Sequence, residues 1–242
     1  MRISIKNPAF LAVKAASFDK TGLKAYYNYA ETTGNLLNHS PSADTIGTNG
    51  DLTTSGTITK TANAWNFSST DGNAIETTTS ILAGTFSAFT MNAWIKPASA
   101  RNAYTICFTA NDGNTNNYNT IYCGVDSKVY GVLRSAAGTT SIITSASSYS
   151  TSVQQMVTVV YDGSLSGTAR WKLYFNGTSE GTADATPDAT YTLTTYPSIA
   201  KQGNSGQPFY TGIIYDTSYW SRALSAAEIT TLYNGGTILS LL

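Results

Sequence analysis

Apolar and polar residues alternate along much of the chain from residue 21 onward, with the period of two that is typical of β-strands. In segment 89–96, FTMNAWIK, the alternation assigns Phe89, Met91, Ala93 and Ile95 to one face and Thr90, Asn92, Trp94 and Lys96 to the other. Segment 170–177, RWKLYFNG, alternates in the same way and ends in Asn-Gly, a strong signal for a two-residue hairpin turn. Further turn clusters divide the chain at intervals typical of a β-sandwich. The pattern predicts one all-β domain.

Segment 221–236, SRALSAAEITTLYNGG, is the exception, because its signals predict a short helix. Ser225 and Glu228 have the spacing of a capping box, in which each side chain bonds the other residue's backbone N–H. Asn234 and Gly235 supply a left-handed stop. A helix of about two turns does not persist alone in water, so we expect its apolar side chains to pack against a sheet.

The charge balance excludes some classes of function. The chain has 14 basic and 14 acidic residues among 242, and no basic stripe of the kind that a nucleic-acid-binding protein carries. No apolar run has the length of a membrane span, and no signal peptide is visible. A neutral surface rich in Thr and Tyr favours a virion, or an extracellular or cell-surface location. Such a location normally requires a signal peptide. Its absence is explained if the protein belongs to a virus particle released by lysis, or if the signal has been removed from the chain.

Four segments occur in the order found in laminin-G-like domains: GLKAYYNYAETTG (22–34), FTMNAWIKP (89–97), VTVVYDG…WKLYFNG (157–177) and FYTGIIYDTSYWSRALSAAEITTLYNGG (209–236). Over residues 21–236 the chain therefore resembles a laminin-G-like domain of the concanavalin A-like lectin and glucanase superfamily. The resemblance implies an all-β jelly-roll sandwich of two curved antiparallel sheets, with adjacent terminal strands and one short C-terminal helix. We assign residues 1–20 to an N-terminal arm and residues 21–242 to the jelly-roll domain.

The sequence predicts no catalytic residues. Glycosidic cleavage uses two carboxyl groups, which on one strand would appear two positions apart. The four glutamates are dispersed instead, at Glu31, Glu76, Glu180 and Glu228. His39 is the single histidine, and its loop context favours a solvated surface group over a catalytic base. A glycoside hydrolase whose carboxylates converge only in the fold is the alternative.

The resemblance also implies a structural calcium in many relatives, but this chain departs from their pattern. Residues 29–31 are Tyr-Ala-Glu where relatives often have Phe-Asp-Glu, and 214–216 are Ile-Tyr-Asp where they often have Ile-Asp-Glu. Calcium needs several oxygen ligands, and one carboxylate is lost at each place. Glu31, Asp71 and Asp216 could still converge with backbone carbonyls. We expect no metal and no other cofactor.

Loop 110–119, ANDGNTNNYN, is the candidate for ligand recognition. Its amide and carboxylate side chains match sugar hydroxyls, and a tyrosine could stack on a sugar ring, although Asn and Asp are also common turn residues. The candidate ligand-binding residues are Asn111, Asp112, Asn114, Asn117 and Tyr118. Trp94, on the polar face of its strand, is either a sugar platform or, as we expect, buried under a loop or in a second packed layer.

The two cysteines, Cys107 and Cys123, lie in two β-like runs joined by that loop. Paired strands of one hairpin could bring them close enough for a disulfide. Two buried thiols that behave as small apolar residues are the other interpretation.

These observations favour a non-enzymatic recognition or structural module. We expect it to bind a glycan or a surface, on a virus particle (as a decoration or tail-associated protein) or on a cell. A purely structural assembly subunit without a soluble ligand is a further alternative. In that case the arm, residues 1–20, would add as a strand to a protein partner or to a second copy of the chain, rather than pair as an edge strand of its own domain.

Overall fold

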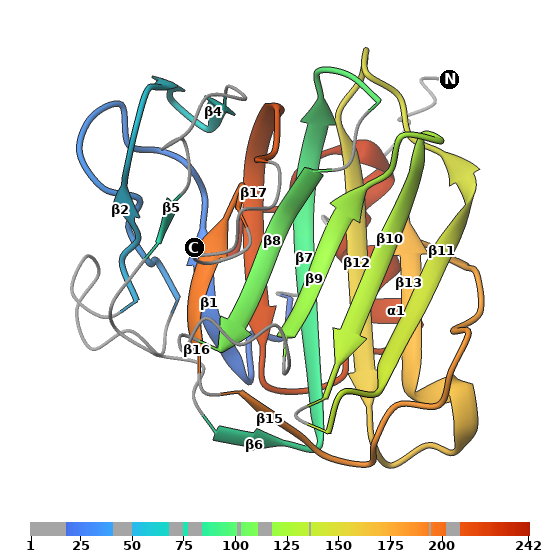
Figure 1. Ribbon diagram of the computed structural model, residues 1–242. Helices are drawn as coiled ribbons and strands as arrows, with labels where there is room; N and C mark the ends of the chain where they lie inside the picture. The colour runs from blue at the N-terminus through green and yellow to red at the C-terminus, as the bar shows by residue number, and fades with distance from the viewer. Residues whose placement is uncertain are drawn as a thin grey trace, which may run out of the picture.

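The computed structural model describes residues 18–40, 50–67, 75–76, 84–100, 103–110, 118–135, 137–193, 195–201 and 209–242. For 75–76, 103–110, 193 and 195–196 only the backbone is described. The chain folds as a sandwich of two large antiparallel sheets, as the alternating pattern predicts (Figure 1). Within these residues no helix is both long enough and apolar enough to cross a membrane.

The first sheet has eight strands and includes both the first and the last strand of the domain. In spatial order its strands are β14 (Thr178–Glu180), β13 (Trp171–Phe175), β12 (Gln155–Asp162), β7 (Ala88–Pro97), β17 (Gly212–Trp220), β4 (Ala64–Phe67) and β3 (Ile58–Thr61). The eighth strand, β1 (Leu23–Tyr27), also pairs with β17, so the terminal strands are adjacent as the family resemblance implies.

The second sheet has seven strands. Their spatial order is β11 (Thr140–Ser148), β10 (Lys128–Arg134), β9 (Tyr118–Cys123), β8 (Ala103–Ala110), β16 (Thr195–Ile199), β5 (Ile75–Glu76) and β2 (Thr53–Thr54). A separate pair is formed by β6 (Gly84–Phe86) and β15 (Tyr191–Leu193). The helical elements are η1 (Gly167–Arg170), α1 (Ala226–Tyr233) and η2 (Asn234–Gly236).

The main core lies between the two sheets, and strand β7 contributes to it as its alternation predicts. Phe89, Met91, Ala93 and Ile95 are fully buried in this core. Burial of each large apolar side chain contributes about 1.5–3 kcal/mol to folding. At β10 the sheets approach so closely that a Cβ on Gly131 would lie 2.7 Å from a methyl carbon of Val159.

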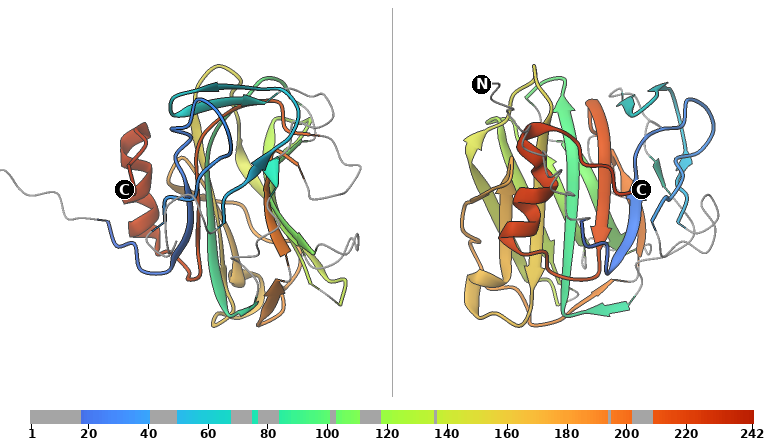
Figure 2. Two further views of the ribbon diagram at one scale, coloured as in Figure 1. Left: turned by 90° about the vertical axis from the view of Figure 1, so that its left-hand side faces the viewer. Right: turned by 180° about the vertical axis from the view of Figure 1, so that it is seen from behind.

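A second apolar layer lies on the outer face of the eight-stranded sheet, where α1 packs (Figure 2). The capping box of Ser225 and Glu228 is present, and Asn234 ends the helix with φ 46° and ψ 43°. Trp94 is buried beneath the helix, and its ring stacks on Tyr233 with 5.8 Å between centroids. The helix prediction is confirmed, and Trp94 belongs to the second packed layer rather than to a sugar platform.

The first described residues and the C-terminal residues meet beside this layer. Phe18 packs against Trp220 with 6.2 Å between ring centroids, and Lys20 Nζ donates to the Leu242 carbonyl at 2.6 Å. Residues 18–20 thus contact the domain, while residues 1–17 of the predicted arm lie outside the described residues.

Candidate ligand-binding surface

The outer face of the seven-stranded sheet lies on the side of the sandwich opposite α1 (Figure 2). Side chains alternate between the two faces of a strand. Ile121, Val129 and Leu133 point into the core, so the residues next to them point outward. The outward residues of β9 and β10 are Tyr118, Thr120, Tyr122, Lys128, Tyr130, Val132 and Arg134. Thr120 and Val132, in the middle of the two rows, are buried, whereas the tyrosines at either end are partly exposed. Lys128 and Arg134 are partly exposed as well, so the accessible part of these two rows is aromatic and basic.

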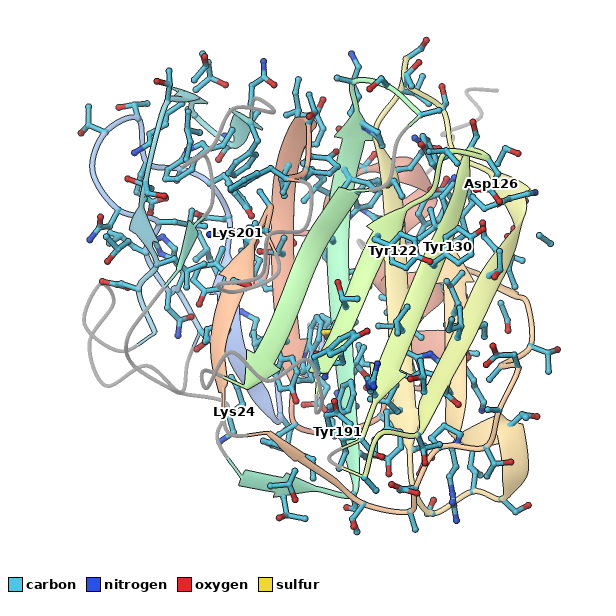
Figure 3. The ribbon with its side chains drawn as sticks, viewed as in Figure 1. Lys24, Tyr122, Asp126, Tyr130, Tyr191 and Lys201 are labelled. Atoms are coloured by element: carbon cyan, nitrogen blue, oxygen red, sulfur yellow. The ribbon has the colours of Figure 1, made fainter. Side chains whose placement is uncertain are left out.

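Tyr122 and Tyr130 form the centre of the candidate surface. They are register partners on β9 and β10, and their rings are stacked with 4.6 Å between centroids and 2° between planes. This spacing matches the distance between neighbouring strands, so the two rings stand side by side above the sheet (Figure 3). On the next strand, the backbone of Tyr104 is the register partner of Tyr122.

A carboxylate is fixed at the edge of this stack by the β9–β10 hairpin. Tyr130 Oη donates to Asp126 Oδ2 at 2.7 Å, and the Lys128 N–H donates to Asp126 Oδ1 at 3.1 Å. The hairpin is itself anchored, because Tyr149 Oη donates to the Gly124 carbonyl at 2.8 Å. We call Tyr122, Tyr130 and Asp126 the tyrosine platform.

Gly124 is needed for this geometry although its backbone is not left-handed. A Cβ at this position would lie 2.5 Å from Asp126 Oδ1 and 2.6 Å from Tyr130 Cε2. Real side chains do not approach so closely, so any larger residue would displace the carboxylate or the ring. The glycine therefore lets Asp126 and Tyr130 meet.

The protonation states follow from these contacts. Burial, with smaller effects of Tyr130, Asp126 and Tyr118, raises the pKa of Tyr122 to about 12. The hydrogen bond to Asp126 is the largest of the effects that raise the pKa of Tyr130. The same hydrogen bond is the main cause that lowers the pKa of Asp126. At neutral pH the tyrosine platform therefore has two neutral phenols and one anionic carboxylate.

The predicted ligand-binding residues are placed only in part. Asn111, Asp112, Asn114 and Asn117 lie outside the described residues. Tyr118 is the first residue of β9, opposite Arg134 and on the outward row of Tyr122.

The tyrosine platform itself was not among the sites predicted from the sequence. The sequence pattern that could have revealed it is a symmetric one: Tyr122 lies four positions before Asp126, and Tyr130 lies four positions after it. A hairpin centred on the turn at 124–127 brings two such positions opposite each other.

The described glutamate side chains have structural partners. Glu31 accepts from His39 Nε2 at 2.8 Å, and Glu180 Oε2 accepts from the Ser147 N–H at 2.8 Å. Glu228 caps α1. The expectation that His39 is a solvated surface group is wrong, because its side chain is only 14% exposed and is paired with Glu31. The loop folds back on β1, where the His39 N–H donates to the Tyr26 carbonyl.

Among the described residues, no group of three or more His, Cys, Asp or Glu side chains is arranged to hold a metal ion. Asp71 lies outside those residues. Asp216 lies at a β-bulge in β17 and is buried, and this burial raises its pKa well above the ordinary value. Its hydrogen-bonding partner is Tyr26.

The cysteines are not register partners. Cys107 lies opposite Thr120, and Cys123 lies opposite Ala103. Cys123 is a buried thiol outside any disulfide. The interpretation as buried, small apolar residues therefore holds for Cys123.

The fold is that of a lectin-like β-sandwich. A family model described as the concanavalin A-like lectin/glucanases superfamily matches residues 67–230, and the chain belongs to that superfamily. No curated protein sequence matches the chain.

Solved structures share the fold. The binding domain of Paraclostridial mosquitocidal protein 1 superposes with a TM-score of 0.68 at 14% identity, over 90% of this chain and 53% of that one. The binding domain of botulinum neurotoxin serotype G gives 0.65 at 13% identity, over 88% and 51%. A heptameric SAP-like pentraxin from Limulus polyphemus gives 0.57 at 16% identity, over 70% and 81%. The chain thus spans about half the length of the two toxin domains, and identities this low show the fold alone.

Proposed function

We propose that this domain is a non-enzymatic recognition module that binds a glycan on its tyrosine platform. The observation that carries the proposal is the stack of Tyr122 and Tyr130 beside the fixed carboxylate of Asp126. The inner faces of the two rings cover each other, so a sugar would place its C–H groups against the outer faces and edges of the pair, and the carboxylate would accept hydrogen bonds from its hydroxyls. Both kinds of group are held in place before a ligand arrives, which reduces the entropic cost of binding.

The fold relatives are consistent with this class of function. Two of them are named as toxin binding domains. The neutral, tyrosine-rich composition favours a location on a virion or at a cell surface. The structural partners of Glu31, Glu180 and Glu228 support binding rather than hydrolysis.

A glycan array probed with the whole chain tests the proposal. The wild-type protein should bind a defined set of glycans, and Tyr122→Ala should weaken that binding by roughly tenfold or more, since stacked aromatic groups are typical binding hot spots. Tyr215→Ala is the matched control, because Tyr215 is a partly buried tyrosine on the opposite, helix-covered layer. Equal loss in both variants would indicate a general loss of folding and contradict the proposed site.

A reducing-sugar release assay on the bound glycans separates binding from hydrolysis. We expect no release. Release that a single Glu or Asp substitution abolishes would establish the glycoside hydrolase alternative instead.

A further inference from the structure

We propose that Asp126 makes the tyrosine platform selective for neutral glycans, and that it excludes glycans carrying a carboxylate, such as sialylated ones. This inference rests on the proposed function and names the ligand class of the same site. The geometry places the charge directly beside the stacked rings, because Asp126 Oδ2 is 2.7 Å from the hydroxyl of Tyr130.

The charge of Asp126 is maintained by its surroundings. One carboxylate oxygen accepts from the Tyr130 hydroxyl and the other from the Lys128 N–H, and both bonds favour the ionised form. An ionised carboxylate has about four acceptor sites in total, so the exposed Asp126 can also accept a hydrogen bond from a sugar hydroxyl. The same oxygens can only repel a second carboxylate.

The cations on the same strand do not offset this charge at the rings. The Lys128 ammonium donates to the Ala146 carbonyl on β11, and its charge is the weakest of the causes that lower the pKa of Asp126. Arg134 follows Tyr130 by four residues along β10, which is about 13 Å in an extended strand. That distance exceeds the Debye length of about 8–10 Å in physiological salt, so Arg134 is largely screened from a ligand beside Asp126.

The expected size of the selectivity follows from Coulomb's law. Two like charges about 5 Å apart reduce affinity about fourfold at the dielectric constant of water and roughly a few hundredfold at the lower effective value near a protein surface. Asp126 is exposed and salt screens its charge, so we take a reduction on the order of tenfold, between these limits. We therefore expect wild-type protein to bind a neutral glycan about ten times more tightly than the same glycan bearing a sialic acid at the contacted end.

The test compares matched glycan pairs on one array, each pair consisting of a neutral oligosaccharide and its sialylated form, such as lactose and sialyllactose. Asp126→Asn removes the charge and keeps an oxygen that can accept the turn hydrogen bond, and Asn is a favoured turn residue, so the hairpin should be retained. The matched control is Asp162→Asn, since Asp162 also accepts from a backbone N–H two residues later, in a different turn.

In Asp126→Asn, the sialylated glycans should gain about tenfold relative to their neutral partners, while Asp162→Asn should keep the wild-type ratio. Glycan binding with equal affinity for both members of a pair, or a ratio that Asp126→Asn leaves unchanged, would overturn the selectivity and leave the proposed function standing. Absence of binding to every glycan on the array would overturn the proposed function and this inference together.

Discussion

Asp216 and Tyr26 form a buried hydrogen-bonded pair on neighbouring strands, and the C-terminal residues close over it. The Leu241 N–H donates to Tyr26 Oη at 3.2 Å, and the side chain of Leu241 is buried. Burial is the largest effect on Asp216, and it raises the pKa of this carboxyl well above its ordinary value. The pair is therefore stable with Asp216 protonated, so that the acid can share a hydrogen bond with the phenol without a buried charge.

This pair predicts a pH dependence of stability. The unfolded chain releases the Asp216 proton near the ordinary pKa of 3.8, whereas the folded chain retains it to a higher pH. The folded state binds more protons in that window, so the stability contributed by Asp216 is complete below pH 4 and is lost as pH rises through the folded-state pKa. Asp216→Asn should flatten the dependence, and its advantage over the wild-type protein should increase with pH.

Urea denaturation at intervals from pH 4 to pH 8 measures this effect. The groups that act on Asp216 from the packed elements are Tyr26 and Tyr29, whose pKa values are both raised, so neither tyrosine titrates in this range. A wild-type stability curve that runs parallel to that of Asp216→Asn would contradict the prediction. Asp162→Asn serves as the control for a surface carboxyl.

The stack of Trp94 on Tyr233 predicts how strongly α1 is held to its sheet. Tyr233→Ala should lower the free energy of unfolding by about 1–3 kcal/mol, because it removes an aromatic pair and part of the cover of the second layer. Ser225→Ala should cost about 1 kcal/mol through loss of the cap. Thr231→Ala, at an exposed position of the same helix, should have almost no effect. Equal effects of all three substitutions would show that the helix is not held by these contacts.

Much of the fold could be predicted from the sequence because the strands are long enough to show their period. In β7, the alternation of residues 89–96 predicts the two faces that the structure has. The helix was predictable because its capping signals are local. The bulge at Asp216 could not be predicted. It is an extra residue in β17 that becomes visible only in the pairing with β7, and no local sequence pattern marks it.

The candidate site was less predictable, because its residues come together through strand pairing. Tyr122 and Tyr130 are eight positions apart and meet only when the turn at 124–127 sets the register. The pairing of His39 with Glu31 likewise depends on how a loop folds back on β1. The composition of a segment favours polar loops as candidate sites, but it does not show which side chains of a strand lie on an exposed sheet face.

Gly124→Ala should distort the tyrosine platform without changing its chemical groups. The added methyl would lie within 2.6 Å of both Asp126 Oδ1 and Tyr130 Cε2, so both groups must move away or the backbone of the turn must shift. Because Gly124 does not have a positive φ, the backbone itself accepts alanine. We expect a folded protein whose glycan affinity falls roughly tenfold, with a change in the near-ultraviolet circular dichroism of the stacked tyrosines. A variant that keeps both the spectrum and the affinity would show that the contact of Asp126 with Tyr130 is not required.

Two N-terminal deletions separate the arm from the domain. Removal of residues 1–17 keeps the packing of Phe18 on Trp220 and the hydrogen bond of Lys20 to Leu242, whereas removal of residues 1–20 eliminates both. The longer deletion also removes the bond of Arg222 to the Asp19 carbonyl, so it should cost at least about 2 kcal/mol, or a few degrees in Tm. The shorter deletion should leave Tm almost unchanged, and size-exclusion chromatography should then show whether it abolishes self-association. If the shorter deletion removes most of the thermal stability of a monomeric protein, residues 1–17 belong to the core of the domain and the prediction of a partner-binding arm fails.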